Sequence, residues 1–449
     1  MIPRILIAGT HSGCGKTTLA SALMAALTQR GLTVQPFKVG PDFIDPSHHT
    51  SICHRFSRNL DPYMMGENGV RQIFEEASKG ADIAVIEGVM GLYDGLEATD
   101  EGSSAHVAKI LDCPVLLTVD VKGMSRSANA IVQGYRSFDP AIRFAGVLFN
   151  RVGSPRHRSM IEQGLACEAV GWIPFDRNRT IESRHLGLKM AHEDSSLGEF
   201  ASVLEEHTDV DRIIEIARDA PEVTSQTIDT TRRQVTAEKE VNETVTLAVA
   251  WDPAFCFYYQ DNFDRLREFG AELTFFSPIT ESLPPCDALY LGGGYPELYA
   301  DALSTAPARE QIHHAADNGL PVYAECGGLT YLTESLQYEG TTYPMAGVLP
   351  ARAAKHDRFQ ALGYVDAKVS APNALLPGGL IYRGHEFHYT ALDCDSDARF
   401  ALTLARGKGI DDGKDGLVEH NVLAGYTHAY MKDDFIQAFT KKIRDIARH

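Results

Sequence analysis

The stretch "RILIAGTHSGCGKTT", residues 4–18, decides the fold, because an apolar run leads directly into a glycine-rich turn. Such a turn between a strand and a helix leaves several backbone N–H groups unpaired and pointing the same way, so it can wrap a phosphate chain. Lys16 adds a cation for the phosphates, and Thr17 adds a hydroxyl for Mg²⁺. The stretch predicts a nucleotide triphosphate site. Its further binding candidates are Gly13, Gly15 and Thr18.

This loop departs from the common phosphate-loop pattern GxxxxGK(S/T) at one place. The pattern wants glycine at position 10, where the chain has Thr10, with Gly9 one place earlier. Strand, glycines, Lys16, Thr17 and a helical segment over residues 16–31 still follow in the expected order. We therefore keep the phosphate-binding prediction over an ordinary strand-to-helix turn.

Composition narrows the class of protein. A chain of 449 residues with 44% hydrophobic content can bury sizeable cores and is long enough for about two or three domains. Its net charge of −18 argues against a sequence-independent nucleic-acid binder. Eight scattered cysteines without CxxC spacing, and no basic leader followed by an apolar stretch, predict a cytoplasmic location. No run approaches the roughly 18 apolar residues of a spanning helix, so we expect no membrane partner.

The order of strand-like and helical segments predicts an α/β protein with two domains. Apolar runs alternate with helical patterns in the first half, which indicates a buried parallel sheet of the P-loop NTPase type over residues 1–219. Residues 220–243 are polar and charged, which predicts a linker. The alternation resumes over residues 244–449, which predicts a second α/β domain.

Carboxylates follow two strands of the first half, in "FKVGPDFIDPSHH" (residues 37–49) and "IEGVMGLYDG" (residues 86–95). Phosphoryl transfer needs a cation across the β- and γ-oxygens of the nucleotide, and carboxylates at neighbouring strand ends can hold one. Each stretch alone would also suit a solvated turn. Together, after a phosphate loop, they indicate a metal site with Asp45 and Glu87 as candidates.

The second half contains a cysteine at a tight turn, in "GLPVYAECGGLTYL" (residues 319–332). An apolar strand ends at Cys326, and two glycines begin a helix, whose N-terminus we expect to lower the pKa of the thiol. The stretch "LGGGYPELY" (residues 291–299) offers backbone N–H groups for an oxyanion from Gly293 and Gly294, beside Gly327. A lone cysteine is more often a small buried apolar residue, but these glycines favour a nucleophile.

Several of these stretches, with "SRNLDPYMM" (57–65), "VLFNRVGSPRH" (147–157) and "ESRHLGL" (182–188), resemble the successive signatures of cobyrinate a,c-diamide synthases. These are relatives of dethiobiotin synthetase with an added class I glutamine amidotransferase domain. The resemblance covers nearly the whole chain except the linker. It implies that Lys16 and Thr17 hold ATP and Mg²⁺, and that Asp45 and Glu87 are metal ligands.

For two further residues the resemblance implies a role that the sequence leaves open. Asn150, at the end of the strand "AGVLFN", would contact the purine base, although an asparagine there is also a common turn former. His428, in "LAGYTHAYM" (423–431), would be the base that activates Cys326. Class I amidotransferases usually place a glutamate two residues after this histidine, where the chain has Tyr430, so the group that orients His428 stays unassigned.

A carboxylate-rich substrate also needs cations. Residues 151–184 contain six arginines against four acids, which reverses the overall charge locally, although a charged surface loop explains this equally well. The substrate-binding candidates are Lys38, Asp42, Asp94, Arg151 and Arg184. The stretch "RGHEFHY" (383–389) lacks a third ligand cluster for zinc, and it is predicted to be a strand of structural or substrate-contacting role.

The resemblance implies an amidoligase that converts the a- and c-acetate carboxylates of cobyrinic acid to amides with ATP, Mg²⁺ and glutamine. The same chemistry on nickel sirohydrochlorin or another tetrapyrrole is the nearest alternative. A P-loop ATPase switch of the partitioning type is an alternative of another class, but it leaves Cys326 and His428 unexplained. Whether the chain forms a homodimer stays open.

Overall fold

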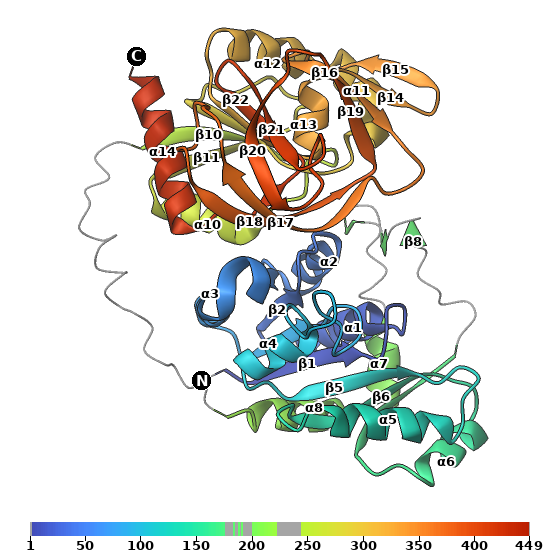
Figure 1. Ribbon diagram of the computed structural model, residues 1–449. Coiled ribbons are helices and arrows are strands. Elements are labelled where there is room, and N and C mark those ends of the chain that lie inside the picture. The colour runs from blue at the N-terminus through green and yellow to red at the C-terminus, as the bar shows by residue number, and fades with distance from the viewer. Residues whose placement is uncertain are drawn as a thin grey trace. The chain divides into compact units, whose positions relative to one another are not determined.

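The computed structural model describes residues 2–175, 200–221 and 244–448, with short described pieces at 183–184, 187–188 and 190–191. The chain divides into two compact units, Met1–Asp229 and Thr230–His449, and each is treated by itself (Figure 1). Of the predicted linker, residues 222–243 lie outside the described residues.

Unit 1 is built on a seven-stranded sheet in the order β3-β2-β4-β1-β5-β6-β7, in which every pair is parallel. Its strands are β1 Arg4–Gly9, β2 Val34–Val39, β3 Arg58–Leu60, β4 Ile83–Glu87, β5 Val115–Asp120, β6 Phe144–Val152 and β7 Ala169–Pro174. A separate pair is formed by β8 Ser183–Arg184 and β9 Gly187–Leu188. All residues of β1, β2 and β4 are buried, as expected for strands covered on both faces.

The described helices of unit 1 flank this sheet (Figure 1). They are α1 Lys16–Gln29, α2 Ile44–Cys53, α3 Pro62–Ala77, α4 Ser104–Ile110, α5 Ser127–Phe138, α6 Pro155–Glu162, α7 Ala201–His207 and α8 Val210–Arg218. One apolar core joins Leu23 of α1 with Leu204 of α7, Ile213 of α8 and Ile5 of β1. Helix α1 is thus enclosed by neighbouring helices, which fixes the loop that precedes it.

The strand order brings three loops of unit 1 together. β1 lies between β4 and β5, and β2 lies on the other side of β4. In this register Glu87 is level with Ile7 on β1 and with Lys38 on β2. Because parallel strands end at the same edge of a sheet, the phosphate loop, Lys38 and Glu87 meet at the edge where such folds bind ligands.

Unit 2 contains a ten-stranded sheet in the order β11-β10-β12-β13-β22-β21-β20-β17-β18-β23 and a four-stranded sheet in the order β15-β14-β16-β19. The large sheet is parallel from β11 to β22 and antiparallel from β22 to β23. Its strands are β10 Val245–Ala250, β11 Ala271–Phe276, β12 Ala288–Leu291, β13 Val322–Glu325, β17 Ala361–Val369, β18 Ile381–His388, β20 Arg399–Arg406, β21 Lys414–Glu419, β22 Val422–Gly425 and β23 His428–Ala429. The small sheet contains β14 Thr333–Tyr338, β15 Thr341–Pro344, β16 Leu349–Lys355 and β19 Thr390–Cys394.

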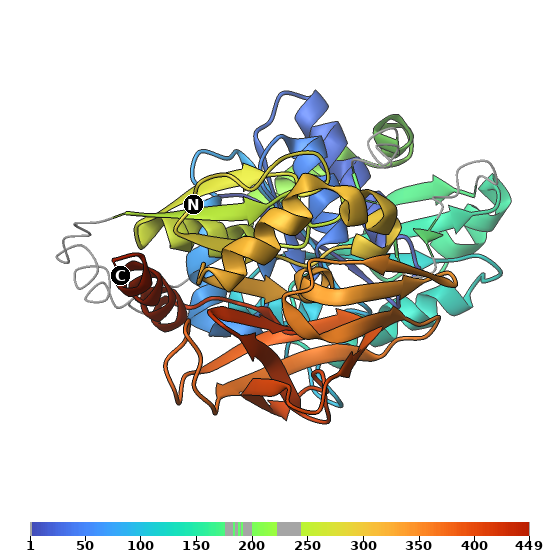
Figure 2. The same ribbon diagram turned by 90° about the horizontal axis from the view of Figure 1, so that it is seen from above.

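The described helices of unit 2 are α10 Gln260–Glu268, the short η2 Pro296–Tyr299, α11 Ala300–Thr305, α12 Pro307–Asp317, α13 Gly327–Leu332 and α14 Asp433–Ala447. The dark red helix α14 packs against α10 and β10 (Figure 2). The α/β prediction for both halves is confirmed. The sequence analysis did not anticipate the small sheet, in which β14 and β16 are parallel and the other pairs antiparallel, nor the antiparallel part of the large sheet apart from β18. Strand β18 contains the predicted strand "RGHEFHY" up to His388.

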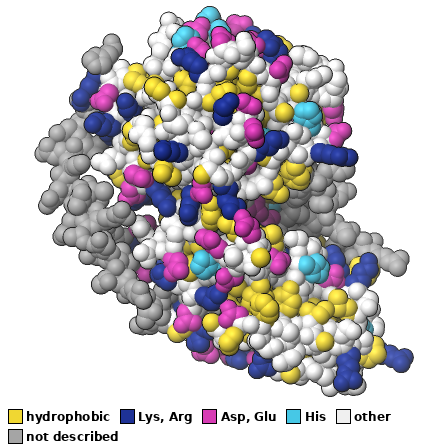
Figure 3. Space-filling view, viewed as in Figure 1, with side chains coloured by type: hydrophobic (Ala, Val, Ile, Leu, Met, Phe, Trp, Pro, Cys, Tyr) yellow, Lys and Arg dark blue, Asp and Glu magenta, His cyan; other side chains and the backbone are white. Residues whose placement is uncertain are grey.

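Charged side chains of both signs are intermingled over the face of the molecule in Figure 3, so the net charge does not gather there in one acidic patch. None of the helices in the described part of the chain combines the length and apolar character that crossing a membrane requires.

Candidate active sites

The phosphate loop of unit 1 depends on glycine at three positions. Gly13 and Gly15 have φ of 82° and 100°, in the left-handed region that favours glycine. A Cβ at Gly15 would collide with Nδ2 of Asn150, and one at Gly9 would collide with Sγ of Cys14. The glycine of this loop that departs from the common pattern is Gly9. A glycine is required there because Cys14 packs against it.

Lys16 and Thr17 begin helix α1 directly after this loop. The Nζ of Lys16 donates to the carbonyl of His11 at 3.2 Å, so the side chain folds back over the loop. Its burial lowers the pKa of Lys16. Thr18 is half-buried on α1. The loop thus presents one buried cation and one hydroxyl beside its glycines.

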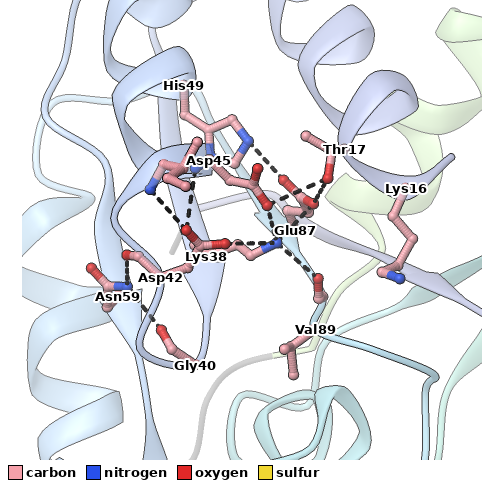
Figure 4. A network of polar contacts seen from close by, with 12 residues as sticks. Lys16, Thr17, Lys38, Gly40, Asp42, Asp45, His49, Asn59, Glu87 and Val89 are labelled. Carbon is pink, nitrogen blue, oxygen red and sulfur yellow. Dashed lines mark hydrogen bonds and ion pairs between the residues drawn. The ribbon is translucent and has the colours of Figure 1, made fainter. Parts of the chain in front are cut away.

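The hydroxyl of Thr17 points into a cluster of buried charges (Figure 4). Its Oγ1 donates to Oε1 of Glu87 at 2.5 Å and to Oδ2 of Asp45 at 3.4 Å. The Nζ of Lys38 lies 2.5 Å from the same oxygen of Asp45 and 2.8 Å from Oε1 of Glu87. His49 Nε2 lies 2.8 Å from the other carboxylate oxygen of Glu87. The structure therefore brings together Thr17, Lys38, Asp45 and Glu87, all of which the sequence singled out.

The carboxylates in this cluster have different pKa values. Burial alone would raise the pKa of Glu87, but Lys38 and His49 outweigh it and hold the pKa below its usual range. For Lys38 burial acts in the other direction and would lower the pKa, but the carboxylates of Asp45 and Glu87 outweigh burial and raise the pKa. Burial and the charge of Asp45 raise the pKa of Asp42 to about 7. Glu87 and Lys38 are therefore a charged pair at neutral pH, whereas Asp42 is close to its titration point.

The donor set suits a hard divalent cation. Among the described residues, no group of three or more His, Cys, Asp and Glu side chains is placed to hold a metal ion. The predicted set instead has the two carboxylates of Asp45 and Glu87 and the hydroxyl of Thr17. The Thr17 Oγ1 lies 2.5 Å from Oε1 of Glu87 and 3.4 Å from Oδ2 of Asp45. Mg²⁺ is commonly held by one or two carboxylates together with substrate phosphates. The residues present fit Mg²⁺, and its binding here stays a prediction.

Two of the substrate-binding candidates also shape turns. Asp42 Oδ1 accepts from the backbone N–H groups of Ile44 and Asp45 at 2.8 and 3.3 Å, and so opens helix α2. Asp94 Oδ2 accepts from the N–H of Gly91 at 2.9 Å. These bonds explain why carboxylates stand at both positions without requiring substrate contact.

Asn150 lies near the end of β6 and touches the phosphate loop. Its Nδ2 donates to the carbonyl of Cys14 at 3.0 Å, and its Oδ1 accepts from the N–H of Arg151 at 2.9 Å. Arg151 pairs with Asp120 at 2.7 Å. Asn150 therefore supports the loop from the adjoining strand, and contact with a base stays a prediction.

The arginine-rich segment is only partly described. Arg158 lies over the ring of Trp172 and pairs with Glu162, which is ordinary surface packing. Arg177 and Arg179 lie outside the described residues, and so does the side chain of Arg184. Arg151 and Arg158 therefore have partners within unit 1 and need no substrate to explain them.

Cys326 of unit 2 stands in a strained turn between β13 and α13. Its φ of 47° and ψ of −94° are unusual for a residue with a side chain. The thiol is 7% exposed, and its Sγ donates to the carbonyl of Phe387 at 3.7 Å. Burial raises the pKa of Cys326, and Glu297 and Glu325 act in the same direction. The expected lowering by the helix N-terminus is outweighed, because α13 is short and the thiol is buried.

The glycine loop after β12 lies between this turn and His428. A Cβ at Gly327 would lie 3.0 Å from the backbone N of Gly294. A Cβ at Gly293 would collide with Cε1 of His428, and one at Gly294 with the carbonyl of Ala254. Only glycine fits this passage, which brings the three predicted oxyanion residues and His428 into one place.

Buried acids hold the backbone around His428. The N–H of Ala429 donates to Oε1 of Glu325 at 3.0 Å. Asp415 accepts from the N–H groups of Tyr426 and Thr427 at 2.9 and 3.1 Å. His428 itself is 1% exposed, and burial lowers its pKa well below the usual range. Burial therefore favours the neutral imidazole, which is the form that a general base needs.

The sequence analysis missed several of these residues. His49 was present in a quoted stretch, but its contact with Glu87 joins helix α2 to strand β4, which lie far apart in the sequence. Glu325 directly precedes Cys326, and this position next to the candidate nucleophile could have identified Glu325 from the sequence. For Asp415 we find no local signal, since its partners lie 11 and 12 residues away.

Two families match most of the chain. Residues 5–187 match the family described as CobQ/CobB/MinD/ParA nucleotide binding domain, and residues 246–435 match the CobB/CobQ-like glutamine amidotransferase domain. Unit 1 is thus a nucleotide-binding domain, and unit 2 is an amidotransferase domain.

Curated relatives match over nearly the full length. A cobyrinate a,c-diamide synthase of Archaeoglobus fulgidus is 42% identical and covers 98% of this chain and 97% of its own. The enzymes of the same name from Methanosarcina barkeri and Methanosarcina acetivorans are 41% and 40% identical, each over 96% of this chain and over 93% and 92% of their own. The chain belongs to the cobyrinate a,c-diamide synthase family.

Proposed function

We propose that this protein converts the a- and c-acetate carboxylates of cobyrinate to amides, with ATP as the activating nucleotide and glutamine as the nitrogen donor. The observation that carries the proposal is the presence of two complete sets of reactive residues on one chain. Unit 1 has a phosphate loop with Lys16 beside the Thr17, Lys38 and Glu87 cluster. Unit 2 has a strained cysteine and a buried histidine around one glycine loop.

In unit 1, a substrate carboxylate would attack the γ-phosphoryl of ATP and give an acyl phosphate and ADP, because ammonia cannot displace oxide from a carboxylate. Lys16 and the phosphate-loop N–H groups offset repulsion between the two anions. Thr17, Asp45 and Glu87 would hold Mg²⁺, which supplies further charge neutralisation across the phosphates. Lys38 lies between the carboxylates of Asp45 and Glu87 and offsets the repulsion between them.

In unit 2, His428 would take the thiol proton of Cys326, and the sulfur would form a bond to the side-chain amide carbon of glutamine. The amide nitrogen takes up a proton and leaves as ammonia, and water then hydrolyses the thioester to glutamate. Backbone N–H groups of Gly293, Gly294 and Gly327, which lie close together, would bind the developing oxyanion. The ammonia would displace phosphate from the acyl phosphate, and a second round would complete the diamide.

The names of the relatives support cobyrinate over nickel sirohydrochlorin as the substrate. The amidotransferase domain argues against a partitioning-type ATPase switch. The proposal is tested by offering cobyrinic acid, hydrogenobyrinic acid and nickel sirohydrochlorin separately with ATP, Mg²⁺ and glutamine. Product masses should show two amidations of cobyrinic acid, and turnover of nickel sirohydrochlorin alone would contradict it.

A further inference from the structure

The imidazole of His428 needs a group that fixes its ring, because the usual glutamate two residues later is replaced by Tyr430. The backbone N–H of Tyr430 donates to the carbonyl of Arg383 at 3.0 Å, and its ring lies edge-on to Tyr259, with ring centroids 6.1 Å apart. The side chain that replaces the acid therefore packs against an aromatic neighbour.

His385 lies directly against the ring of His428. The two ring centroids are 4.8 Å apart and the ring planes differ by 17°, so the imidazoles are stacked. Their residues are register partners in the antiparallel pair of β18 and β23, which fixes the two Cα atoms opposite each other. Both side chains are at least 95% buried, with exposures of 4% and 1%. A stacked partner at this depth limits rotation of the His428 ring.

His385 is itself held by a second buried residue. The Oη of Tyr259 and the Nδ1 of His385 lie 2.8 Å apart in a hydrogen bond, and Tyr259 is 2% exposed. Burial lowers the pKa of His385 to about 3, so the ring stays neutral across the working range of an enzyme. The bond to Tyr259 therefore fixes the orientation of the His385 ring.

The same strand also reaches the nucleophile. Two residues after His385, the carbonyl of Phe387 accepts from Sγ of Cys326. Strand residues two apart are separated by roughly 6.6 Å. β18 thus contacts both the nucleophile and the ring of the base.

We propose that His385 is a positioning residue for the glutaminase reaction: stacked on His428 and held by Tyr259, it fixes the ring plane in which His428 takes the proton from Cys326. This inference rests on the proposed glutaminase function of unit 2. It assigns the orienting role to a ring stack in place of the carboxylate that the usual glutamate would supply.

The experiment uses His385→Ala, His385→Phe and Tyr259→Phe in the full chain, with glutamine hydrolysis measured as kcat and KM. His385→Ala should lower kcat by about 30-fold while KM for glutamine changes by less than about threefold, because a misplaced catalytic group costs rate more than binding. His385→Phe keeps a flat ring and should recover most of kcat. Tyr259→Phe should give a smaller loss than His385→Ala, since the stack survives.

His388→Phe is the matched control. His388 is a buried histidine of the same strand, and its ring stacks on Tyr426 with the ring centroids 3.5 Å apart. It should lower kcat much less than His385→Ala does. Equal losses in His385→Ala and His388→Phe, equal losses in His385→Ala and His385→Phe, or an unchanged kcat in His385→Ala would each overturn the inference. Thermal unfolding of each variant identifies a failure to fold, in which case His385→Phe and Tyr259→Phe decide.

Wild-type protein and Cys326→Ala separate this inference from the function on which it rests. Absence of glutamine hydrolysis by the wild type, or full hydrolysis by Cys326→Ala, would overturn the proposed function and the inference with it. Hydrolysis that depends on Cys326 but not on His385 would overturn the inference alone.

Discussion

The hydroxyl of Thr17 meets the carboxylate of Glu87 at 2.5 Å, although 70 residues separate them in the chain. One residue begins the helix after the phosphate loop, and the other ends the adjacent strand β4. The contact brings the phosphate loop and the acidic cluster together at one edge of the sheet. The role of each group in the phosphate loop and the acidic cluster can be tested by substituting one residue at a time.

Lys16→Ala should abolish amidation with glutamine and with ammonia alike, because no acyl phosphate would form. Loss of a cation at a phosphoryl-transfer site costs several kcal/mol of transition-state stabilisation, so we expect a fall of about 100-fold or more. Product formation is measured with each nitrogen donor. The exposed Lys79→Ala is the control and should retain full activity, and near-normal turnover by Lys16→Ala would refute the ATP site.

Asp45→Asn and Glu87→Gln should raise the Mg²⁺ concentration needed for half-maximal amidation and lower the turnover number. Glutamine hydrolysis by the same full-length variants should persist, because unit 2 keeps its residues. Titration of activity with Mg²⁺ provides the measurement, and the exposed Glu75→Gln is the charge-matched control. The same Mg²⁺ dependence in both variants as in the wild type would place the metal elsewhere.

Cys326→Ala should eliminate glutamine-dependent amidation and preserve most of the amidation driven by concentrated ammonium salt at mildly alkaline pH. Cys286→Ala removes another thiol of unit 2 and should affect neither rate. If Cys326 were only a packing residue, its truncation would cost about 1 kcal/mol of stability and lower both rates together. An unchanged ratio of the two rates would falsify the nucleophile assignment.

Glu325 predicts a pH dependence of stability. Burial raises its pKa from 4.5 to about 7, so the folded state keeps the proton longer than the unfolded state does. The contribution of Glu325 to the stability of the folded state is therefore present below about pH 4.5 and is lost as pH rises through about 7. Relative to the wild type, Glu325→Gln should become more stable by about 3 kcal/mol as pH rises across this window.

Fluorescence can report this on the second unit alone. The chain has two tryptophans, Trp172 in unit 1 and Trp251 in unit 2. In a Trp172→Phe background, denaturant unfolding followed through Trp251 gives the free energy of unfolding of unit 2. The prediction would be contradicted if the free energy of unfolding of Glu325→Gln differed from that of the wild type by a constant amount from pH 4.5 to 8.

The parallel parts of both units could be predicted because their strands are continuous apolar runs, such as β1 and β13, that lead into glycine-rich turns. The antiparallel strands could not be predicted so readily. The half-exposed β17 mixes buried and exposed residues, and its partners are set by long-range pairing.

Site residues with familiar chemistry, such as Lys16 and Cys326, could be named from local motifs. Lys38 was named too, but its ion pair with Glu87 depends on the register between β2 and β4. His385 and Glu325 were in quoted stretches, yet their contacts with His428 and Ala429 arise only when distant strands are brought together. Local sequence does not encode such contacts.

The bond from Cys326 Sγ to the carbonyl of Phe387 has a consequence for chemical durability. Peroxide attacks the thiolate, and it requires access to the sulfur. A buried thiol that keeps its proton and lies against a carbonyl meets neither condition. The resting enzyme should therefore withstand oxidants that would consume an exposed catalytic cysteine, and its nucleophile should become vulnerable only while the site is engaged with glutamine.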